Sequence, residues 1–506
     1  MSQSLLGGFG DRRLAATGEA LLSAMQKQRT MCLDALADSR AQKRRFNDFL
    51  DNEAVTRYEM LVRTGQITAQ RAAGREVLVV ADSSDLIYTK HRASKRGFGP
   101  MGNDTDIGVL IHPLLALDAG TGGIIGLVGA EVINREPGEV ADRKSRGADD
   151  KESRRWLAGA ETAGDVLKAA AKITMVEDRE GDIYDQFARR PDNVDLLVRA
   201  RHNRSLTSGQ KLFDACANWS EVRRYTITVS AKRVGKGQRA ERTALVAVRF
   251  GEVTLRQPYY ASSGLPASLT LRVVDVREID PPDIKERVHW CLLTTHAVNT
   301  AEDAMRMVRW YRLRWTIEQV FRSMKTDGVD VQTSQVTTPN SLLKLVTVAL
   351  IAAVRVMQVV IGRDGSTGQK LTDVVADPAE VPALRAISQS LQGRTDKLKN
   401  PHDPDSLAWY AWIAARLGGW SGYTSKGYKP AAPKSWPAAS NASTPWSPAG
   451  CWQIVPQLPD SGRPERAEKE PARFLRSIDQ TENASPIRVR LPGCSRAACR
   501  STGSPS

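Results

Sequence analysis

Apolar residues between positions 76 and 200 occur in short runs that are separated by polar turns and by one longer stretch with helical spacing. Short runs rich in Val and Ile are typical of strands, whereas apolar positions three and four apart are typical of an amphipathic helix. The pattern therefore predicts three strands, a helix, a strand, a short helix and a strand, at 76–82, 107–118, 123–133, 151–170, 172–178, 182–190 and 194–200.

Different patterns border this region on both sides. Residues 203–298 hold several β-type segments between turn residues, which predicts an antiparallel sheet that looks like an insertion. Residues 10–60 and 300–420 have mainly helical spacing. The order of patterns indicates an α/β fold class with helical regions at both ends.

One apolar run, residues 342–362, is nearly long enough to cross a membrane. Lys344, Arg355 and Gln358 interrupt it, and each charge at membrane depth would cost roughly 2.5–3.5 kcal/mol. We therefore expect a buried helix and no membrane partner. The first residues of the chain also lack the apolar core of a signal peptide.

Composition adds a preference for a polyanionic partner. The 506 residues include 72 basic and 57 acidic side chains, a formal charge of +15, and nucleic acid is the commonest such partner in the cytoplasm. The basic cluster Arg40, Lys43, Arg44 and Arg45 fits either a DNA-binding module or a solvated helix. The six cysteines show no CxxC pair and no ligand spacing with histidine, so we expect a reduced cytoplasmic protein without structural zinc.

Residues 311–325 are predicted to form a helix with a mixed polar stripe beside an apolar one. At about 100° per residue, Tyr311, Arg314, Glu318 and Lys325 project within an arc of about 60°. For this helix alone, a salt-bridged surface is the simpler interpretation, because charged residues four apart commonly pair. Carboxylates elsewhere in the chain favour a functional interpretation.

Two aspartates stand where predicted strands end. Asp82 ends the first strand and Asp178 the fourth, and the ends of strands in open α/β sheets are where ligands gather. Each aspartate alone could instead be a helix cap or a turn residue. Asp85 and Glu177 lie close enough in sequence to compete for the same role.

Two aspartates and Glu318 together would repel one another strongly unless cations neutralise them. Hard oxygen ligands suit Mg²⁺ or Mn²⁺, and a pair of such ions is suited to in-line displacement at a phosphate. Arg314, Lys325 and Tyr311 would then hold the neighbouring phosphates by charge and by a phenolic hydrogen bond.

The spacing Y-x2-R-x3-E-x6-K, the segments "ADSSDLIYT" and "EDREGDIY" and the strand order together resemble the DDE transposases of insertion sequence family four (IS-four type), which move DNA by cut and paste. The resemblance covers about residues 8–428. It implies a ribonuclease H-like catalytic core that is interrupted by an antiparallel β-rich insertion and flanked by helical N- and C-terminal domains. The implied organisation is a DNA-binding domain at 1–70, the core at 71–202, the insertion at 203–298, the core helix with the catalytic Glu at 299–335, a dimerisation region at 336–428 and a tail at 429–506.

The resemblance also implies roles for individual residues. Asp82, Asp178 and Glu318 match the catalytic, metal-binding triad of the family. Tyr311, Arg314, Lys325, Arg199 and Trp290 match its DNA-contacting positions. The tryptophan of the family stacks on a flipped base, and stacking offsets a flipping cost of a few kcal/mol. For Trp290, an ordinary apolar strand residue is the alternative.

The reaction implied by the resemblance needs double-stranded DNA and two Mg²⁺ or Mn²⁺ ions per active site. Water cuts one strand, the freed 3′-hydroxyl forms a hairpin with the other strand, the hairpin reopens, and the 3′ end joins target DNA. Family members work as homodimers on paired terminal inverted repeats, with helices after residue 326 as the expected dimer contacts. We expect a cytoplasmic, nucleoid-associated protein.

The C-terminal part departs from the family pattern. After Lys429 the chain carries 12 of its 25 prolines and no periodicity, which predicts disorder at 429–506 and suggests a change of reading frame. An active transposase, a defective copy that only binds transposon ends, and a stand-alone nuclease all remain open on the sequence.

Overall fold

A computed structural model describes residues 4–88, 95, 97–101, 106–135, 154–229, 232–234, 237–284, 287–325, 329–331, 334–374 and 378–420. The predicted disordered tail at 429–506, and the change of reading frame suspected near its start, lie outside the described residues.

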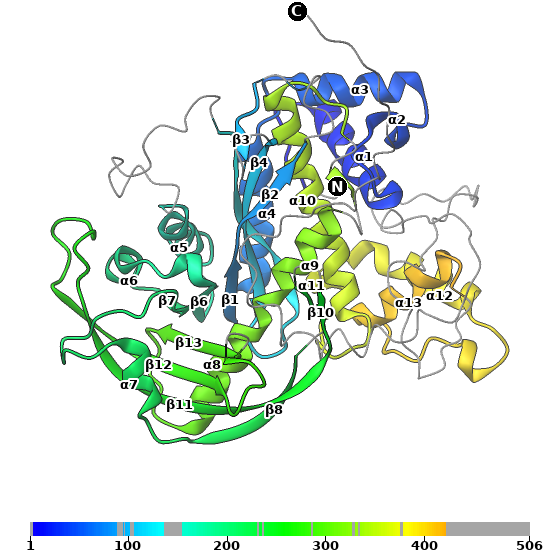
Figure 1. Cartoon of the computed structure of the whole chain (residues 1–506). Coiled ribbons are helices and arrows are strands. Elements are labelled where there is room, and N and C mark those ends of the chain that lie inside the picture. Colours follow the sequence, from blue (N-terminus) through cyan, green and yellow to red (C-terminus); the bar gives the residue numbers. More distant parts are fainter. Residues whose placement is uncertain are drawn as a thin grey trace, which may run out of the picture.

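One mixed sheet of eleven strands runs through the molecule (Figure 1). Its strands are β1 Glu76–Ala81, β2 Ser84–Ile87, β3 Pro100–Met101, β4 Asp106–Asp118, β5 Ile124–Ile133, β6 Lys172–Glu177, β7 Val194–Arg199, β8 Arg223–Val229, β11 Arg242–Arg256, β12 Ser268–Glu278 and β13 His289–Thr294. A separate pair is formed by β9 Lys232–Val234 and β10 Gly237–Arg239.

The first half of the sheet has the topology expected of a ribonuclease H-like core. β5 pairs with β4 and β4 with β1, both antiparallel, and β1, β6 and β7 follow as parallel neighbours. The five predicted strands are confirmed to within one or two residues. The short strands β2 and β3, which pair with β4, were not predicted.

Residues 203–298 form antiparallel strands as predicted, but not a sheet of their own. β13 pairs with β7, and β12, β11 and β8 follow in order. Leu292–Thr294 cover the edge of β7 that would otherwise expose unpaired backbone groups. These strands therefore extend the core sheet.

Helices cover both faces of the core sheet, with α5 and α6 on one side and α9 and α10 on the other (Figure 1). Side chains of β1 alternate between these layers, because Leu78 and Val80 join the core on the α10 side and Val77 and Val79 the core on the α5 side. The helices are α1 Arg12–Gln28, α2 Leu33–Leu36, α3 Arg40–Asp51, α4 Arg57–Ala72, α5 Arg154–Val166, α6 Tyr184–Arg189, α7 Leu212–Ala217, α8 Ala301–Leu313, α9 Trp315–Met324, α10 Pro339–Gly362, α11 Leu371–Val374, α12 Val381–Leu391 and α13 Leu407–Leu417.

Helix α10 is the apolar segment that resembles a membrane span. Its length and hydropathy would suffice to cross a bilayer, but 89% of its most apolar window is buried inside the molecule. It packs against α1, α3, α4, α9, α13 and β5. The prediction of a buried helix is confirmed.

The helix predicted at 311–325 is interrupted at Arg314, but the backbone of Arg314 stays helical, and Tyr311, Arg314 and Glu318 still point to the same strand ends as predicted. Helix α8 ends at Leu313 and α9 begins at Trp315, and the backbone N–H groups of Arg314 and Ile317 donate to carbonyls three residues earlier. Such tight turns change the direction of a helix. Arg314 therefore stands at the joint between α8 and α9.

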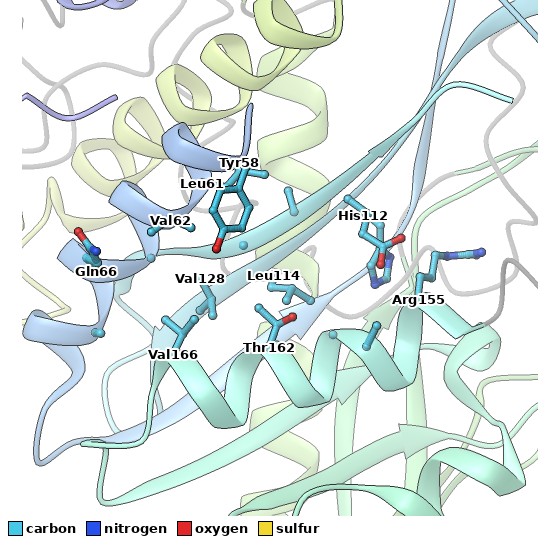
Figure 2. A pocket seen from close by; sticks show the side chains of 17 residues that line it. Tyr58, Leu61, Val62, Gln66, His112, Leu114, Val128, Arg155, Thr162 and Val166 are labelled. Atoms are coloured by element: carbon cyan, nitrogen blue, oxygen red, sulfur yellow. The ribbon is translucent and has the colours of Figure 1, made fainter. Parts of the chain in front are cut away.

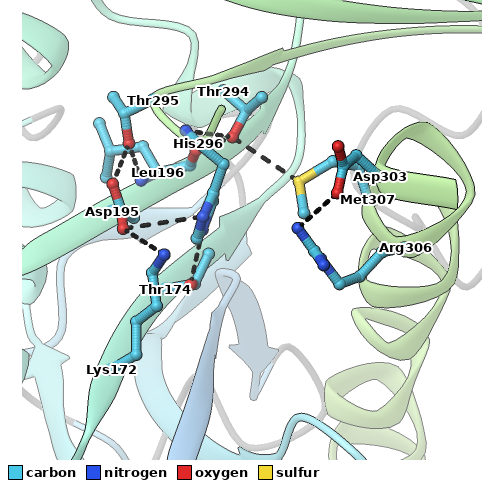
Figure 3. Close-up of polar contacts among 10 residues, drawn as sticks. All are labelled: Lys172, Thr174, Asp195, Leu196, Thr294, Thr295, His296, Asp303, Arg306 and Met307. Atoms are coloured by element: carbon cyan, nitrogen blue, oxygen red, sulfur yellow. Dashed lines mark hydrogen bonds and ion pairs between the residues drawn. The ribbon is translucent and has the colours of Figure 1, made fainter. Parts of the chain in front are cut away.

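A buried polar network fixes the end of β6 and β7 opposite to their carboxyl ends (Figure 3). Asp195 accepts a hydrogen bond of 2.7 Å from Thr295 and lies 3.5 Å from Lys172. His296 lies 2.9 Å from Thr174, and burial lowers its pKa to about 4. The network joins β6 and β7 to the segment after β13. It does not involve the carboxyl ends of these two strands, where Asp178 and Arg199 lie.

Candidate active site

Asp82 and Asp178 come together because β1 and β6 are parallel and in register. Ala81, the last residue of β1, is paired with Glu177, the last residue of β6, so the aspartates that follow leave the sheet side by side. Asp178 stands at the N-cap of a short 3-10 turn without a side-chain capping bond. Neither aspartate faces the packed layers, and Asp82 and Asp178 keep 18% and 27% side-chain exposure.

Arg314 links these strand ends to α9. Its Nη1 donates to Asp82 Oδ2 at 2.9 Å and lies 3.7 Å from Glu318 Oε1. Tyr311, three residues earlier, donates its hydroxyl to Asp178 Oδ1 at 3.1 Å. The three predicted acidic residues therefore gather around one guanidinium at the carboxyl edge of β1 and β6.

The charges of this cluster shift its protonation equilibria. Burial, opposed by Arg314 but reinforced by Glu318 and Asp178, raises the pKa of Asp82 to about 7. Burial also acts on Asp178, but Arg314 and Arg199 outweigh it and lower the pKa of that carboxyl. Burial disfavours the charged guanidinium, yet Asp178 and the other carboxylates raise the pKa of Arg314 well above its usual value. Arg314 thus stays charged, whereas Asp82 is only partly ionised near neutral pH.

Arg199 and Trp290 lie beside the cluster but are buried. Arg199 is 2% exposed, donates to the backbone carbonyl of His289 at 2.8 Å, and lies 3.8 Å from Asp178. Trp290 is 1% exposed, and its ring lies 6.1 Å from that of Tyr311. In this state Trp290 is a core residue of β13, which is the alternative that the sequence left open.

Lys325, the last residue of the signature, lies farther along the same edge. Its Nζ donates to Ser84 Oγ at 2.8 Å at the start of β2, and burial lowers its pKa. The competing residue Asp85 lies on β2 near Lys325, away from Arg314. Glu177 is fully buried and accepts two hydrogen bonds from Gln186, so it is not part of the cluster.

A positioning network behind Asp82 was not found from the sequence. The backbone N–H of Ser83 donates to Asp82 Oδ1 at 2.7 Å, and the Ser83 hydroxyl lies 2.9 Å from His112 Nδ1 and 3.0 Å from Arg155 Nε. Arg155 also pairs with Glu180 at 2.9 Å. The only sequence signal was the position of Ser83 directly after Asp82, because His112 and Arg155 lie in other elements.

A mostly apolar hollow of about 330 Å³ lies between α4, β5 and α5. Figure 2 shows His112 and Arg155 at one end of the hollow and Gln66 at the other. Burial, with the Arg155 charge as a second cause, lowers the pKa of His112 to about 3, so its ring is neutral. The acidic cluster itself does not line this hollow.

The donor set at the strand ends fits divalent cations. Three carboxylates face Arg314 and Arg199, so one negative charge stays uncompensated when all three carboxylates are ionised. Carboxylate oxygens with partial solvent access suit hard ions such as Mg²⁺. Arg314 now stands among the carboxylates, and among the described residues the tightest group of possible ligands lies elsewhere, at Cys216, Asp275 and Cys291.

Comparison with known families agrees with this geometry. Residues 174–355 match the model of a family described as the transposase DDE domain. The matched segment begins in β6 and ends in α10, so it contains Asp178 and Glu318, while Asp82 precedes it. Such a domain acts on DNA and uses divalent metal. The matched domain therefore indicates a DDE transposase, an enzyme of the polynucleotidyl transferase type.

Proposed function

We propose that this transposase moves an insertion sequence by cut and paste in the manner of the IS-four type, through strand cleavage, hairpin formation and strand transfer. The observation that carries the proposal is the gathering of Asp82, Asp178 and Glu318 around Arg314 at the edge of the sheet. Three carboxylates from three separate segments meet at one place on the surface.

In this proposal Asp82, Asp178 and Glu318 are the catalytic residues and hold two Mg²⁺ or Mn²⁺ ions. When bound, the ions activate the attacking oxygen and stabilise the leaving oxygen. The Ser83 backbone and its contacts with His112 and Arg155 orient the Asp82 carboxylate. The helical frame of α9 orients Glu318, because four of its neighbours on that helix are buried in the core.

Arg314, Tyr311 and Lys325 are proposed to bind DNA phosphates. Arg314 and Tyr311 now bond to Asp82 and Asp178, so both side chains have donors already directed at the place where the scissile phosphate would lie. Lys325 on the same edge would contact the flanking backbone. Arg199 supports Asp178 from within the sheet.

Trp290 is proposed to stack on a flipped base during hairpin formation. Because its ring is buried against Tyr311, this role requires the ring to leave the core when DNA binds. The free energy of that movement would add to the cost of base flipping.

The remaining parts of the proposal concern assembly. Helices α1–α4 would bind the terminal inverted repeats, and a homodimer would form on paired ends and then engage target DNA. Contacts between subunits would come from the helices after residue 326. The enzyme would act in the cytoplasm on the nucleoid.

The test uses a labelled duplex with the terminal inverted repeats found beside the gene, together with Mg²⁺. We expect a nick followed by a hairpin product from the wild type and bound but uncut DNA from Glu318→Gln. Glu302→Gln is the matched control, because Glu302 is an exposed glutamate in the first turn of α8.

The products separate the three functions that the sequence left open. Hairpins that depend on the terminal repeats support the transposase. Binding without cutting by the wild type would indicate a defective copy that occupies transposon ends. Nicks on any duplex would indicate a nuclease, and cutting by Glu318→Gln would remove that residue from the mechanism.

A further inference from the structure

A second cluster of potential ligands lies on the face of β13 that points away from the active site. Asp275 of β12 and Cys291 of β13 are direct partners in the antiparallel ladder, so their side chains share one face of the sheet. Cys216 of α7 covers that face. One ligand atom from each residue lies within 4.8 Å of the other two, and all three residues are buried.

The Asp275 carboxylate is only partly satisfied in this cluster. Its Oδ1 lies 2.6 Å from His289 Nε2 and accepts a hydrogen bond of 3.4 Å from Arg277 Nη2. Its Oδ2 is buried without a hydrogen bond among the described residues, and Arg277 Nε lies 3.3 Å away as an ion pair that is not aligned for one. A fully buried carboxylate oxygen without a hydrogen bond is costly, and it marks a place where a ligand would contribute free energy.

The composition of the cluster fits a borderline-soft divalent cation. With a metal bound, two thiolates and one carboxylate would carry three negative charges, which Zn²⁺ and the Arg277 guanidinium would together balance. Thiolate sulfur selects zinc over the hard cations that suit the carboxylates at the strand ends. His289 would hold Asp275 as an outer partner of the metal.

We propose that Cys216, Asp275 and Cys291 bind one Zn²⁺ ion at a structural site that is separate from the active site. The two thiol protons would pass to solvent when the ion binds. Tetrahedral zinc with sulfur ligands at about 2.3 Å places two sulfurs about 3.8 Å apart, so atoms within 4.8 Å of one another need to close by at most about 1 Å. A water would fill the fourth position.

The site would fix the part of the sheet that supports the active site. Cys291 follows Trp290 directly on β13, and the two side chains point to opposite faces, Trp290 toward Tyr311 and Cys291 toward Cys216. Arg199, which pairs with Asp178, also donates to the β13 backbone at His289. Zinc on one face would therefore fix the backbone of β13 that carries Trp290. The inference does not depend on the cut-and-paste proposal.

The experiment measures bound metal in the full chain purified under reducing conditions and dialysed after addition of Zn²⁺. We expect about one zinc per chain for the wild type, loss of it in Cys291→Ser, and full retention in Cys32→Ser and in Glu318→Gln. Cys32 is a half-buried cysteine near α2, remote in sequence from the site, and serves as the control.

Cobalt provides a second measurement that does not require a variant to fold. Co²⁺ added to the wild type should give the intense sulfur-to-metal charge-transfer band of thiolate coordination, and Zn²⁺ should abolish the band. The proposal would be overturned if the wild type bound no zinc and Cys216 and Cys291 were found as unreactive free thiols or as a disulfide. Zinc content unchanged in Cys291→Ser would overturn it as well.

Discussion

Replacing Asp82 with asparagine should stabilise the metal-free protein above neutral pH. The pKa of Asp82 is raised to about 7 in the folded protein against a reference of 3.8, so the folded state binds more protons than the unfolded state between these values. For a carboxyl whose folded pKa is raised, stability falls as the pH rises through this window. Asparagine keeps the shape of the side chain and removes the ionisation.

The expected magnitude follows from the size of the shift. About three pKa units correspond to about 4 kcal/mol of unfolding free energy at pH values above about 8, as an upper limit. With about 2.1 cal/mol/K per residue, and roughly 420 residues in the folded part, this is a rise in Tm of about 4–5 °C. Near pH 4, where Asp82 is protonated in the folded state, the variant should gain nothing.

The assay is thermal unfolding in excess chelator at about pH 8 and about pH 4, for wild type, Asp82→Asn and the control Asp192→Asn. Asp192 is exposed in the turn before β7 and should leave Tm unchanged at both pH values. A fall in Tm for Asp82→Asn at the higher pH would refute the reasoning. It would mean that the loss of the Arg314 pair outweighs the relief of repulsion among the carboxylates.

Three further predictions test separate parts of the site. Mg²⁺ must bind ionised Asp82, so the affinity of the protein for Mg²⁺, measured by calorimetry, should rise about tenfold per pH unit up to about pH 7 and then level off. An affinity that does not change between about pH 5 and 7 would contradict this. Trp290→Ala should cost roughly 3–5 kcal/mol of stability because the ring is buried, so Trp290→Phe is the variant for activity, and it should reduce hairpin formation more than the first nick. Equal losses at both steps would indicate a structural role. Lys325→Gln should weaken binding to the terminal repeats and reduce the slope of log affinity against log salt by about one. The control Lys168→Gln, at an exposed lysine, should leave that slope unchanged. An unchanged slope for Lys325→Gln would exclude a phosphate contact.

The sequence predicts the central strands and two of the acidic residues from the same feature, which is the point where an apolar run ends. A strand that is covered on both faces must be apolar throughout, so the first charged residue after β1 marks the end of burial. Asp82 was found in this way. The rule is less direct for Asp178, because the charged residue before it, Glu177, is still buried at the end of β6. That Asp82 and Asp178 lie side by side follows from the parallel pairing of β1 and β6, which the expected topology already contained.

The remaining features depend on contacts between distant residues. The break at Arg314 is not marked by Gly or Pro, and Arg314 instead forms an ion pair with Asp82, 232 residues earlier. Trp290 lies in an apolar strand in either interpretation, and only the packing of Tyr311 against it decides its burial. Cys216 and Cys291 are far apart in the chain, so no ligand spacing reveals them, and they meet because α7 packs on β12.

The central claim is that Asp82, Asp178 and Glu318 jointly bind divalent cations. The most direct measurement is a crystal structure of the full chain soaked in Mn²⁺, with anomalous differences used to locate the metal. We predict anomalous peaks bounded by oxygens of all three carboxylates, with the Arg314 guanidinium moved out from among them. Well-ordered carboxylates that keep Arg314 between them at saturating Mn²⁺, with no peak at the strand ends, would contradict it.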